Sequence, residues 1–185
     1  HSGELVVVTR NSPTTYYLDS DGQAAGFEYD LVKAFAQRQG WKLRIEVAEN
    51  LDDLLEAVAK GRAHLAAAGL TASDERRARF RFGPNYGQIK EWVVCRQADR
   101  LPARLEDLAG LRLEVVGGSS HVERLRLHER RLPGLKWVEA PVPGSEELLE
   151  RVEIGLADCT VVDSDSLDVA RNFHPGLRPA FVLES

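Results

Sequence analysis

The sequence predicts an α/β protein made of two similar lobes, and three observations support this prediction. Short apolar runs, typical of buried strands, alternate with longer segments of helical periodicity. This alternation occurs twice, on either side of an extended segment at residues 86–96 that has no turn residue after Gly87. The 185 residues are enough for two small α/β lobes. We therefore expect a first lobe at residues 1–88 and a second lobe at residues 89–185.

The first half has the order strand, helix, strand, helix, strand. Apolar residues recur at helical spacing in two segments, and Gly40 and Gly61 provide the C-terminal stops. A βαβαβ order implies a parallel sheet covered by helices. The expected elements, in chain order, are Leu5–Val8, Tyr29–Gln39, Leu43–Val47, Leu51–Val58 and Leu65–Ala68.

The second half is a further series of strands and helices after the extended segment. Because open α/β sheets bind ligands at the carboxyl ends of their strands, the loops after these strands are the places to search for a site. The expected elements are Leu111–Val116, Ser120–Leu132, Leu135–Val138, Ser145–Ile154, Asp158–Val162, Ser164–Asn172 and Leu177–Leu183.

Composition and charge are those of an ordinary globular chain and exclude several classes of partner. Hydrophobic residues make up 43% and charged residues 29%, which argues against disorder. The net charge is −5 and no Lys/Arg run alternates with aromatic residues, so we expect no nucleic-acid partner and no anionic membrane. The longest apolar stretches, Leu5–Thr9 and Leu65–Leu70, are too short to span a bilayer. The chain starts at His1 and contains no Met, which we interpret as a processed or excised fragment.

The two cysteines, Cys95 and Cys159, both lie in apolar strand-like runs. They are either two small buried hydrophobic residues or a disulfide, and we favour the first interpretation. Neither has a CxxC partner or a His at metal-ligand spacing. We therefore expect no zinc site, and we expect no other metal or cofactor.

The turn after the third predicted strand offers a site for a carboxylate. Thr71 and Asp74 have the spacing of a capping box at a helix start. Such a turn presents backbone N–H groups and the positive end of the helix dipole, and Arg76 could add a bidentate fork. The alternative is a solvated charged helix, because more arginines follow at Arg77, Arg79 and Arg81.

The loop after the next predicted strand is rich in glycine and serine. Gly117 and Gly118 allow a ligand to approach the backbone closely, and Ser120 with Glu123 has the spacing of a capping box. The alternative is a plain turn with a good N-cap. His121 is isolated in the sequence and is expected to be exposed, so we assign it no role as a ligand or a base.

Asp163 ends a predicted buried strand, where its carboxylate could pair with a ligand ammonium group. The alternative is capping of the following helix by Asp163 or Ser164. A cationic site in the first half and an anionic site in the second half suit a zwitterion held between two lobes that close on it.

Three segments, in their order and spacing, resemble motifs of the type II periplasmic solute-binding proteins of the amino-acid class, solute-binding family 3. They are Gly22 with Gly26–Leu31, Thr71–Arg76 with Phe82–Tyr86, and Ala157–Asp163. The resemblance covers nearly the whole chain and implies the two-lobed α/β fold of that family. In that fold the chain returns to the first lobe, and we expect this C-terminal return to be lacking in a sequence that ends at Ser185.

A more specific resemblance is to the amino-terminal, non-catalytic domain of the membrane-bound lytic murein transglycosylase F family. It rests on Thr9–Tyr17, Ala66–Thr71, Gly118–His121, Gly144–Leu149 and Val162–Ser164. In that family the domain is tethered to a peptidoglycan-cleaving module at the outer membrane and is thought to regulate it. The resemblance implies a periplasmic regulatory domain. Its partners would be an amino-acid-like or muropeptide-like ligand and the transglycosylase module of the same parent chain.

The resemblance also implies a set of ligand-binding residues. A ligand carboxylate would lie between the turn of the first half and the serines of the second, and a ligand amino group would bind the aspartate. The chain departs from the family pattern at Arg10-Asn11, Leu51 and His64, which concerns the pocket for the ligand side chain. The expected ligand-binding residues are Asn11, Tyr16, Gly69, Thr71, Arg76, Ser119, Ser120 and Asp163.

We expect no catalysis by this chain, because it shows no paired carboxylates at catalytic spacing and no nucleophile–base set. Glu184-Ser185 follows a strand-like run rather than lying in a helix and is not interpreted as catalytic. Three alternatives share the fold. They are an amino-acid receptor of an ABC transporter, a sensor domain of a membrane kinase and an enzyme similar to cyclohexadienyl dehydratase.

Overall fold

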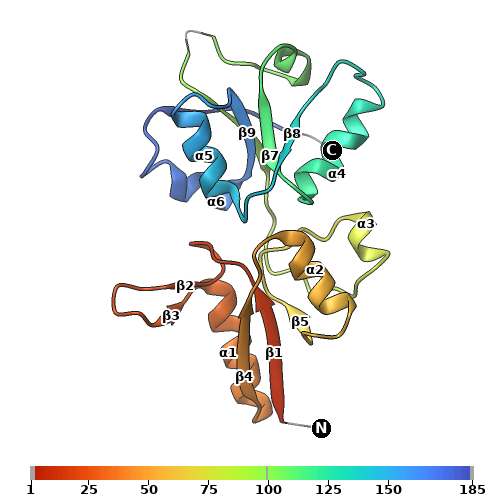
Figure 1. Cartoon of the computed structure of the whole chain (residues 1–185), viewed down its shortest axis with the longest axis vertical. Helices are drawn as coiled ribbons and strands as arrows, with labels where there is room; N and C mark the ends of the chain where they lie inside the picture. Colours follow the sequence, from red (N-terminus) through yellow and green to blue (C-terminus); the bar gives the residue numbers. More distant parts are fainter. Residues whose placement is uncertain (1–2, 99, 184–185) are drawn as a thin grey trace. The chain divides into compact units, whose positions relative to one another are not determined.

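Figure 1 shows the computed structural model of the chain, which describes residues 3–98 and 100–183. The chain divides into two compact units, His1–Pro84 and Asn85–Ser185, each with its own sheet and hydrophobic core. The predicted α/β class is therefore confirmed. Glu184 and Ser185 lie outside the described residues. None of the described helices has the length and hydrophobicity that a membrane span requires.

The first unit is built on a parallel sheet of three strands in the order β4-β1-β5. The central strand β1 (Glu4–Thr9) pairs with β4 (Lys42–Val47) on one side and with β5 (Leu65–Ala66) on the other. β5 is two residues shorter than predicted, although Ala67 and Ala68 remain buried. Because the strands are parallel, the residues that follow them meet at one edge of the sheet.

Helices α1 (Phe27–Gln39) and α2 (Leu51–Ala59) cover the two faces of this sheet. Successive residues of a strand point to opposite faces, so β1 contributes to both layers. Val6 and Val8 pack in the cluster that contains α2, and Leu5 and Val7 pack in the cluster that contains α1.

Local signals set the bounds of these helices. Gly40 follows α1 in the left-handed conformation (φ 69°), as the sequence predicts for a helix stop. Asn50 caps α2, and its side-chain oxygen accepts a hydrogen bond from the Asp53 N–H at 2.9 Å. The short hairpin of β2 (Tyr17–Leu18) and β3 (Ala24–Ala25) was not predicted, because two-residue strands leave no periodicity.

The second unit is built on a mixed sheet of five strands in the order β10-β6-β9-β7-β8. β7 (Leu113–Val116) runs parallel to β8 (Val138–Ala140) and to β9 (Cys159–Asp163). β6 (Glu91–Arg96) runs antiparallel to both of its neighbours, β9 and β10 (Leu177–Val182). The carboxyl ends of β7 and β9 therefore lie at the same edge of the sheet as the beginning of β6.

Helices cover both faces of this sheet as well. α4 (Ser120–Glu129) packs in one buried cluster, and α5 (Ser145–Glu153) and α6 (Ser164–Ala170) pack in the other. A short 3-10 helix, η1 (Leu105–Leu108), precedes β7. β8 begins at Val138 rather than at Leu135, because Leu135 is buried in the first cluster from a loop and takes no part in the ladder.

The first unit has one further helix, the short α3 (Asp74–Arg77), which follows β5.

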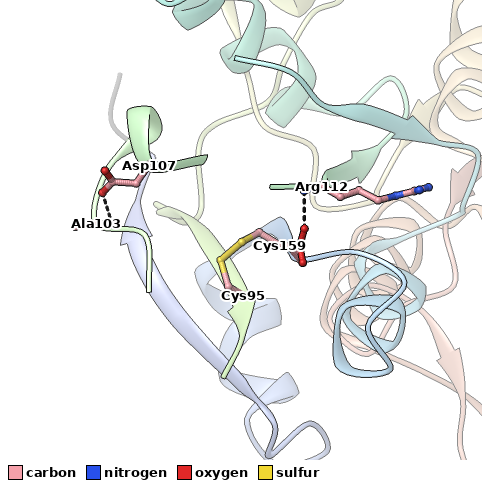
Figure 2. Close-up of a disulfide and its surroundings, with 6 residues drawn as sticks. Cys95, Ala103, Asp107, Arg112 and Cys159 are labelled. Carbon is pink, nitrogen blue, oxygen red and sulfur yellow. Dashed lines mark hydrogen bonds between the residues drawn. A yellow bond between two sulfur atoms is a disulfide. The ribbon is translucent and has the colours of Figure 1, made fainter. Parts of the chain in front are cut away.

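Cys95 and Cys159 form a disulfide between β6 and β9 (Figure 2). The two residues lie directly opposite each other in the antiparallel register, with their Cα atoms 4.1 Å apart, and both are buried. The prediction of two free thiols is therefore wrong. The pairing depends on the register of two strands whose cysteines are 64 positions apart in the chain, and no local sequence pattern shows that register.

The second unit contains a buried carboxylate, Glu114. It is 1% exposed, on β7. The Nε atoms of Arg151 and Arg112 donate to its two oxygens, each at 2.7 Å. The hydrogen bonds from Arg151 lower the pKa of Glu114 against the opposing effect of burial, and Arg112 adds to the lowering. Glu114 is thus held as an anion that the arginines neutralise.

Candidate functional site

Gly69 forms a tight turn at the carboxyl edge of the first unit's sheet. Its φ of 60° lies in the left-handed region, which favours glycine. Its N–H donates to Oε1 of Glu28, a buried residue of α1, at 2.9 Å. A Cβ atom at Gly69 would lie 3.5 Å from the Thr15 methyl group and 3.8 Å from Nη2 of Arg10. The turn is therefore packed closely against α1 and the loop that follows β1.

Arg76 is the buried member of the arginine group that follows this turn. It is 3% exposed, whereas Arg77, Arg79 and Arg81 are exposed. Its Nη1 donates to the carbonyl of Thr71 at 3.4 Å, so the turn and the guanidinium are brought together. The expectation of a capping box at Thr71 is wrong, because α3 begins at Asp74.

The cap of α3 is Ser73. Its hydroxyl accepts a hydrogen bond from the Arg76 N–H at 3.3 Å, which fixes the backbone of Arg76. The predicted cap at Thr71 lies two positions before the residue that caps the helix in the structure. Thr71 is half-buried and contributes its carbonyl rather than a cap.

Asn11 and Tyr16 belong to the loop after β1. Isolated bridges pair Asn11 and Ser12 with Tyr16, which closes the loop on itself. The ring of Tyr16 packs edge-to-face on that of Tyr29 in α1, with centroids 5.7 Å apart. Tyr16 is half-buried and Asn11 is exposed, so the bridged loop keeps these two predicted residues next to each other.

In the second unit, Ser119 and Ser120 mark the start of α4. Ser119 is the N-cap residue and Ser120 is the first helical residue, so the predicted capping box of Ser120 with Glu123 is wrong by one position. Ser119 makes no side-chain cap, and its buried Oγ has no hydrogen-bond partner among the described residues. Gly118 has a φ of 67° and turns the chain from β7 into the helix.

Asp163 closes β9 and stands at the N-cap position of α6, but its side chain does not cap that helix. Instead, its Oδ1 lies 3.0 Å from Nε2 of His121. The hydroxyl of Ser164 accepts a hydrogen bond from the backbone N–H of Lys90 at 3.2 Å. His121 is buried, at 6% exposure, so its expected isolation and exposure are wrong.

Three charged or basic residues that the sequence analysis did not assign to a site, Glu91, His121 and Arg124, lie around Asp163 at this edge of the second unit's sheet. Glu91 is the first residue of β6 and the register partner of Asp163, and Arg124 of α4 forms an ion pair with Glu91. Within residues 3–98 and 100–183, Glu91, His121 and Asp163 are the one set of His and acidic side chains close enough to share a metal ion. The antiparallel pairing of β6 with β9 brings Glu91 and Asp163 together, and His121 joins them from the first turn of α4, which follows β7, the parallel neighbour of β9.

The structure therefore gathers the predicted residues in two groups. Gly69, Thr71 and Arg76 lie together in the first unit, around a buried guanidinium. Ser119 and Ser120 lie beside His121, whose ring contacts Asp163, in the second unit. The first group suits an anion, and the second combines hydroxyl groups and a helix start with a carboxylate.

Comparison with known proteins identifies the family of the chain. Residues 5–168 match the bacterial extracellular solute-binding proteins, family 3. The chain is similar to a membrane-bound lytic murein transglycosylase F of Maricaulis maris, at 44% identity over 175 residues, and to one of Pseudomonas fluorescens, at 40% identity over 182 residues. These alignments cover 95% and 98% of this chain but 38% and 37% of the relatives. The chain thus spans less than two-fifths of their length.

Solved structures agree with the family match. The arginine-bound form of a truncated ArgBP from T. maritima is similar with a TM-score of 0.85 and 25% identity, over 99% of this chain and 84% of that chain. A histidine kinase sensor domain with similarity to periplasmic binding proteins has a TM-score of 0.80 at 22% identity, over 98% and 78%, and shows the fold alone. The predicted periplasmic-binding-protein fold is confirmed. The chain belongs to the bacterial extracellular solute-binding proteins, family 3.

Proposed function

We propose that this chain is a periplasmic binding domain for a small amino-acid-like or peptidoglycan-peptide ligand, and that it regulates a lytic murein transglycosylase module in a longer protein. Membership of the solute-binding family supports the binding role. The similarity to part of two transglycosylases F supports attachment to such a module.

The buried guanidinium of Arg76 carries the proposal. It stands at the carboxyl edge of a parallel sheet, where α/β proteins bind ligands, and the Ser73 cap and the Thr71 carbonyl fix its position. A planar guanidinium binds a carboxylate in a bidentate way, and burial strengthens that pairing. We therefore assign the ligand carboxylate to Arg76, with Gly69 and Thr71 forming the turn around it.

In the second unit we assign polar contacts of the ligand to Ser119, Ser120 and Asp163. The buried Ser119 hydroxyl lies at the start of α4, where the helix dipole favours an anionic group. Asp163 would take a ligand ammonium group in competition with the imidazole of His121, which contacts the same carboxylate. Asn11 and Tyr16 are assigned to the remainder of the ligand.

Isothermal titration calorimetry with free amino acids and with peptidoglycan stem peptides tests the proposal. We expect saturable binding of at least one of these classes. We expect Arg76→Ala to lose about 2–4 kcal/mol of binding free energy, about 30- to 900-fold in Kd, which is the scale for removing one partner of a desolvated charge pair. Arg77→Ala is the matched control, because Arg77 is the next residue of α3 and is exposed.

The control should bind like the wild type. Unchanged affinity in Arg76→Ala, or no saturable binding of either class of solute, contradicts the proposal. A folded Arg76→Ala chain, judged by its circular dichroism, is a condition for the comparison, and Arg76→Lys, which keeps the charge but removes the fork, provides a second variant with an intermediate loss.

A second candidate is an amino-acid receptor of an ABC transporter. The similarity to an arginine-bound ArgBP favours it. The same titrations, with arginine among the amino acids, distinguish the two candidates in one case. Saturable binding of stem peptides without binding of free amino acids favours the regulatory domain over a transport receptor.

A further inference from the structure

Three side chains with metal-ligating atoms meet at one edge of the second unit's sheet. Glu91, His121 and Asp163 each offer one such atom, and these atoms lie within 4.8 Å of one another. Glu91 is 4% exposed, His121 is 6% exposed and Asp163 is half-buried. They come from the start of β6, the first turn of α4 and the end of β9, so three rigid elements hold the cluster.

Two carboxylates face each other in this cluster. Glu91 and Asp163 are register partners in the antiparallel pair of β6 and β9. Like charges directly opposite each other in a sheet repel, and burial increases the cost. The pair therefore needs cations, and two positions already supply basic groups, with Arg124 against Glu91 and His121 against Asp163.

Three buried atoms of the cluster have no hydrogen-bond partner among the described residues. They are Nδ1 of His121 and both carboxylate oxygens of Glu91, of which Oε2 forms the ion pair with Arg124. A metal ion shared with Asp163 would take the lone pair of Nε2 of His121, because this nitrogen lies 3.0 Å from Oδ1 of Asp163. Because nearly all buried polar atoms in native proteins have partners, the unpartnered Oε1 of Glu91 beside these two groups indicates that an electron-pair acceptor binds there.

We propose that Glu91, His121 and Asp163 form a binding site for a divalent transition-metal ion of the Zn²⁺ type. One imidazole with two carboxylates suits zinc, whereas Mg²⁺ and Ca²⁺ prefer oxygen ligands alone. Zinc–ligand distances of about 2.0–2.1 Å place tetrahedral ligand atoms about 3.3 Å apart. The cluster therefore requires at most about 1.5 Å of adjustment from the 4.8 Å limit. The sequence predicted no metal site because its three ligands are 30 or more positions apart.

Arg124 fits this site as a supporting residue. It lies one turn after His121 on α4, and its Nε contacts Oε2 of Glu91, which leaves Oε1 for the metal. Metal-ligating carboxylates usually make such a second contact, which orients them. If no metal binds, Arg124 and His121 are the basic groups that contact the two carboxylates.

The site overlaps with the proposed solute site only at Asp163. Three protein ligands leave a fourth coordination position that a carboxylate or amide oxygen of a solute could occupy. Metal binding and solute binding would then be coupled. The test below uses the metal alone, so its failure leaves the proposed function standing, and a failure of solute binding leaves the metal site standing.

The whole chain is first treated with a chelator, dialysed and titrated with Zn²⁺ in a calorimeter, with Mg²⁺ and Ca²⁺ as comparison ions. We expect one zinc ion per chain and no saturable binding of the comparison ions. His121→Gln and Glu91→Gln should each weaken zinc binding at least about tenfold, the lower bound for loss of a group that orients a metal. His174→Gln is the matched control, because His174 lies in the same unit and contacts a carboxylate, Glu153, at 2.7 Å.

Zinc binding that survives in His174→Gln and is lost in the two cluster variants supports the proposal. No saturable zinc binding by the wild type, or binding that His121→Gln and Glu91→Gln leave intact, overturns it. If either variant lacks the wild-type circular-dichroism spectrum, Co²⁺ titration of the wild type decides. We expect a hyperfine-shifted imidazole resonance that persists in His174→Gln, and its absence overturns the proposal.

Discussion

Replacing both Cys95 and Cys159 with Ala removes the covalent link between β6 and β9. The link joins positions 64 residues apart, and the chain-entropy relation for a closed loop of that length gives about 4 kcal/mol at 25 °C. Both sulfur atoms are buried, so their removal also leaves a small cavity, which adds to the loss. We therefore expect the second unit to lose about 4 kcal/mol or more of its free energy of unfolding.

Urea denaturation followed by tryptophan fluorescence measures this loss. Trp92 and Trp137 belong to the second unit and Trp41 to the first, so a Trp41→Phe background restricts the signal to the second unit. The reduced wild-type chain is the matched comparison, because it keeps both sulfur atoms and lacks only the bond.

Two results would contradict this prediction. A difference below about 1 kcal/mol between the oxidised and reduced chains, with an unchanged denaturant slope, would refute the entropic reasoning. Two titratable thiols in the denatured but unreduced chain would refute the disulfide itself.

Three further predictions concern the buried charge and catalysis. Glu114→Gln should lower the free energy of unfolding of the second unit, measured by urea denaturation, by about 3 kcal/mol. This value is at the lower end for breaking a buried ion pair, because both arginines reach solvent. Glu139→Gln is the control, because Glu139 forms an exposed pair with Arg126, and its loss should be less than about 1 kcal/mol. Because Arg151 lowers the pKa of Glu114, the stability from this group is complete above the ordinary pKa of glutamate and is lost as the pH falls through the lowered pKa of the folded chain. The urea midpoint of the wild type should fall over that window more steeply than that of Glu114→Gln, and equal slopes would contradict the assignment. Incubated with purified sacculi, the chain should release no anhydro-muropeptides above the buffer control, and release that survives repurification would contradict the absence of a catalytic module.

Local signals made much of the fold predictable. The strand at Leu5–Val8 is a short apolar run and the helix from Leu51 has a period of 3.6 residues, and both appear with nearly the predicted bounds. In α1 the pattern gave two neighbouring apolar stripes, and the sequence alone did not show which of them faces the sheet. Packing in the cluster with β1 buries Val32 and Ala36, whereas Leu31 and Phe35 of the other stripe are exposed.

The candidate site depends more on contacts between distant residues. The turn at Gly69 and the position of Arg76 follow from local sequence, although only the backbone identifies Ser73 as the cap. The contact of His121 with Asp163 requires β7 and β9 to be parallel neighbours, and Glu91 enters only through the antiparallel register of β6. These contacts join residues that are far apart in the chain, so no local sequence pattern shows them.

The guanidinium of Arg76 provides the most direct test of solute binding. In a ¹⁵N-labelled chain, its Nε–Hε resonance can be assigned by its loss in Arg76→Lys, and that of Arg77, whose Nε donates to the carbonyl of Ala72 at 3.2 Å, serves as the internal reference. On titration with a stem peptide or an amino acid that binds, we expect the Arg76 resonance to shift and saturate while the Arg77 resonance stays. Saturable shifts elsewhere in the spectrum with an unmoved Arg76 resonance would contradict the account.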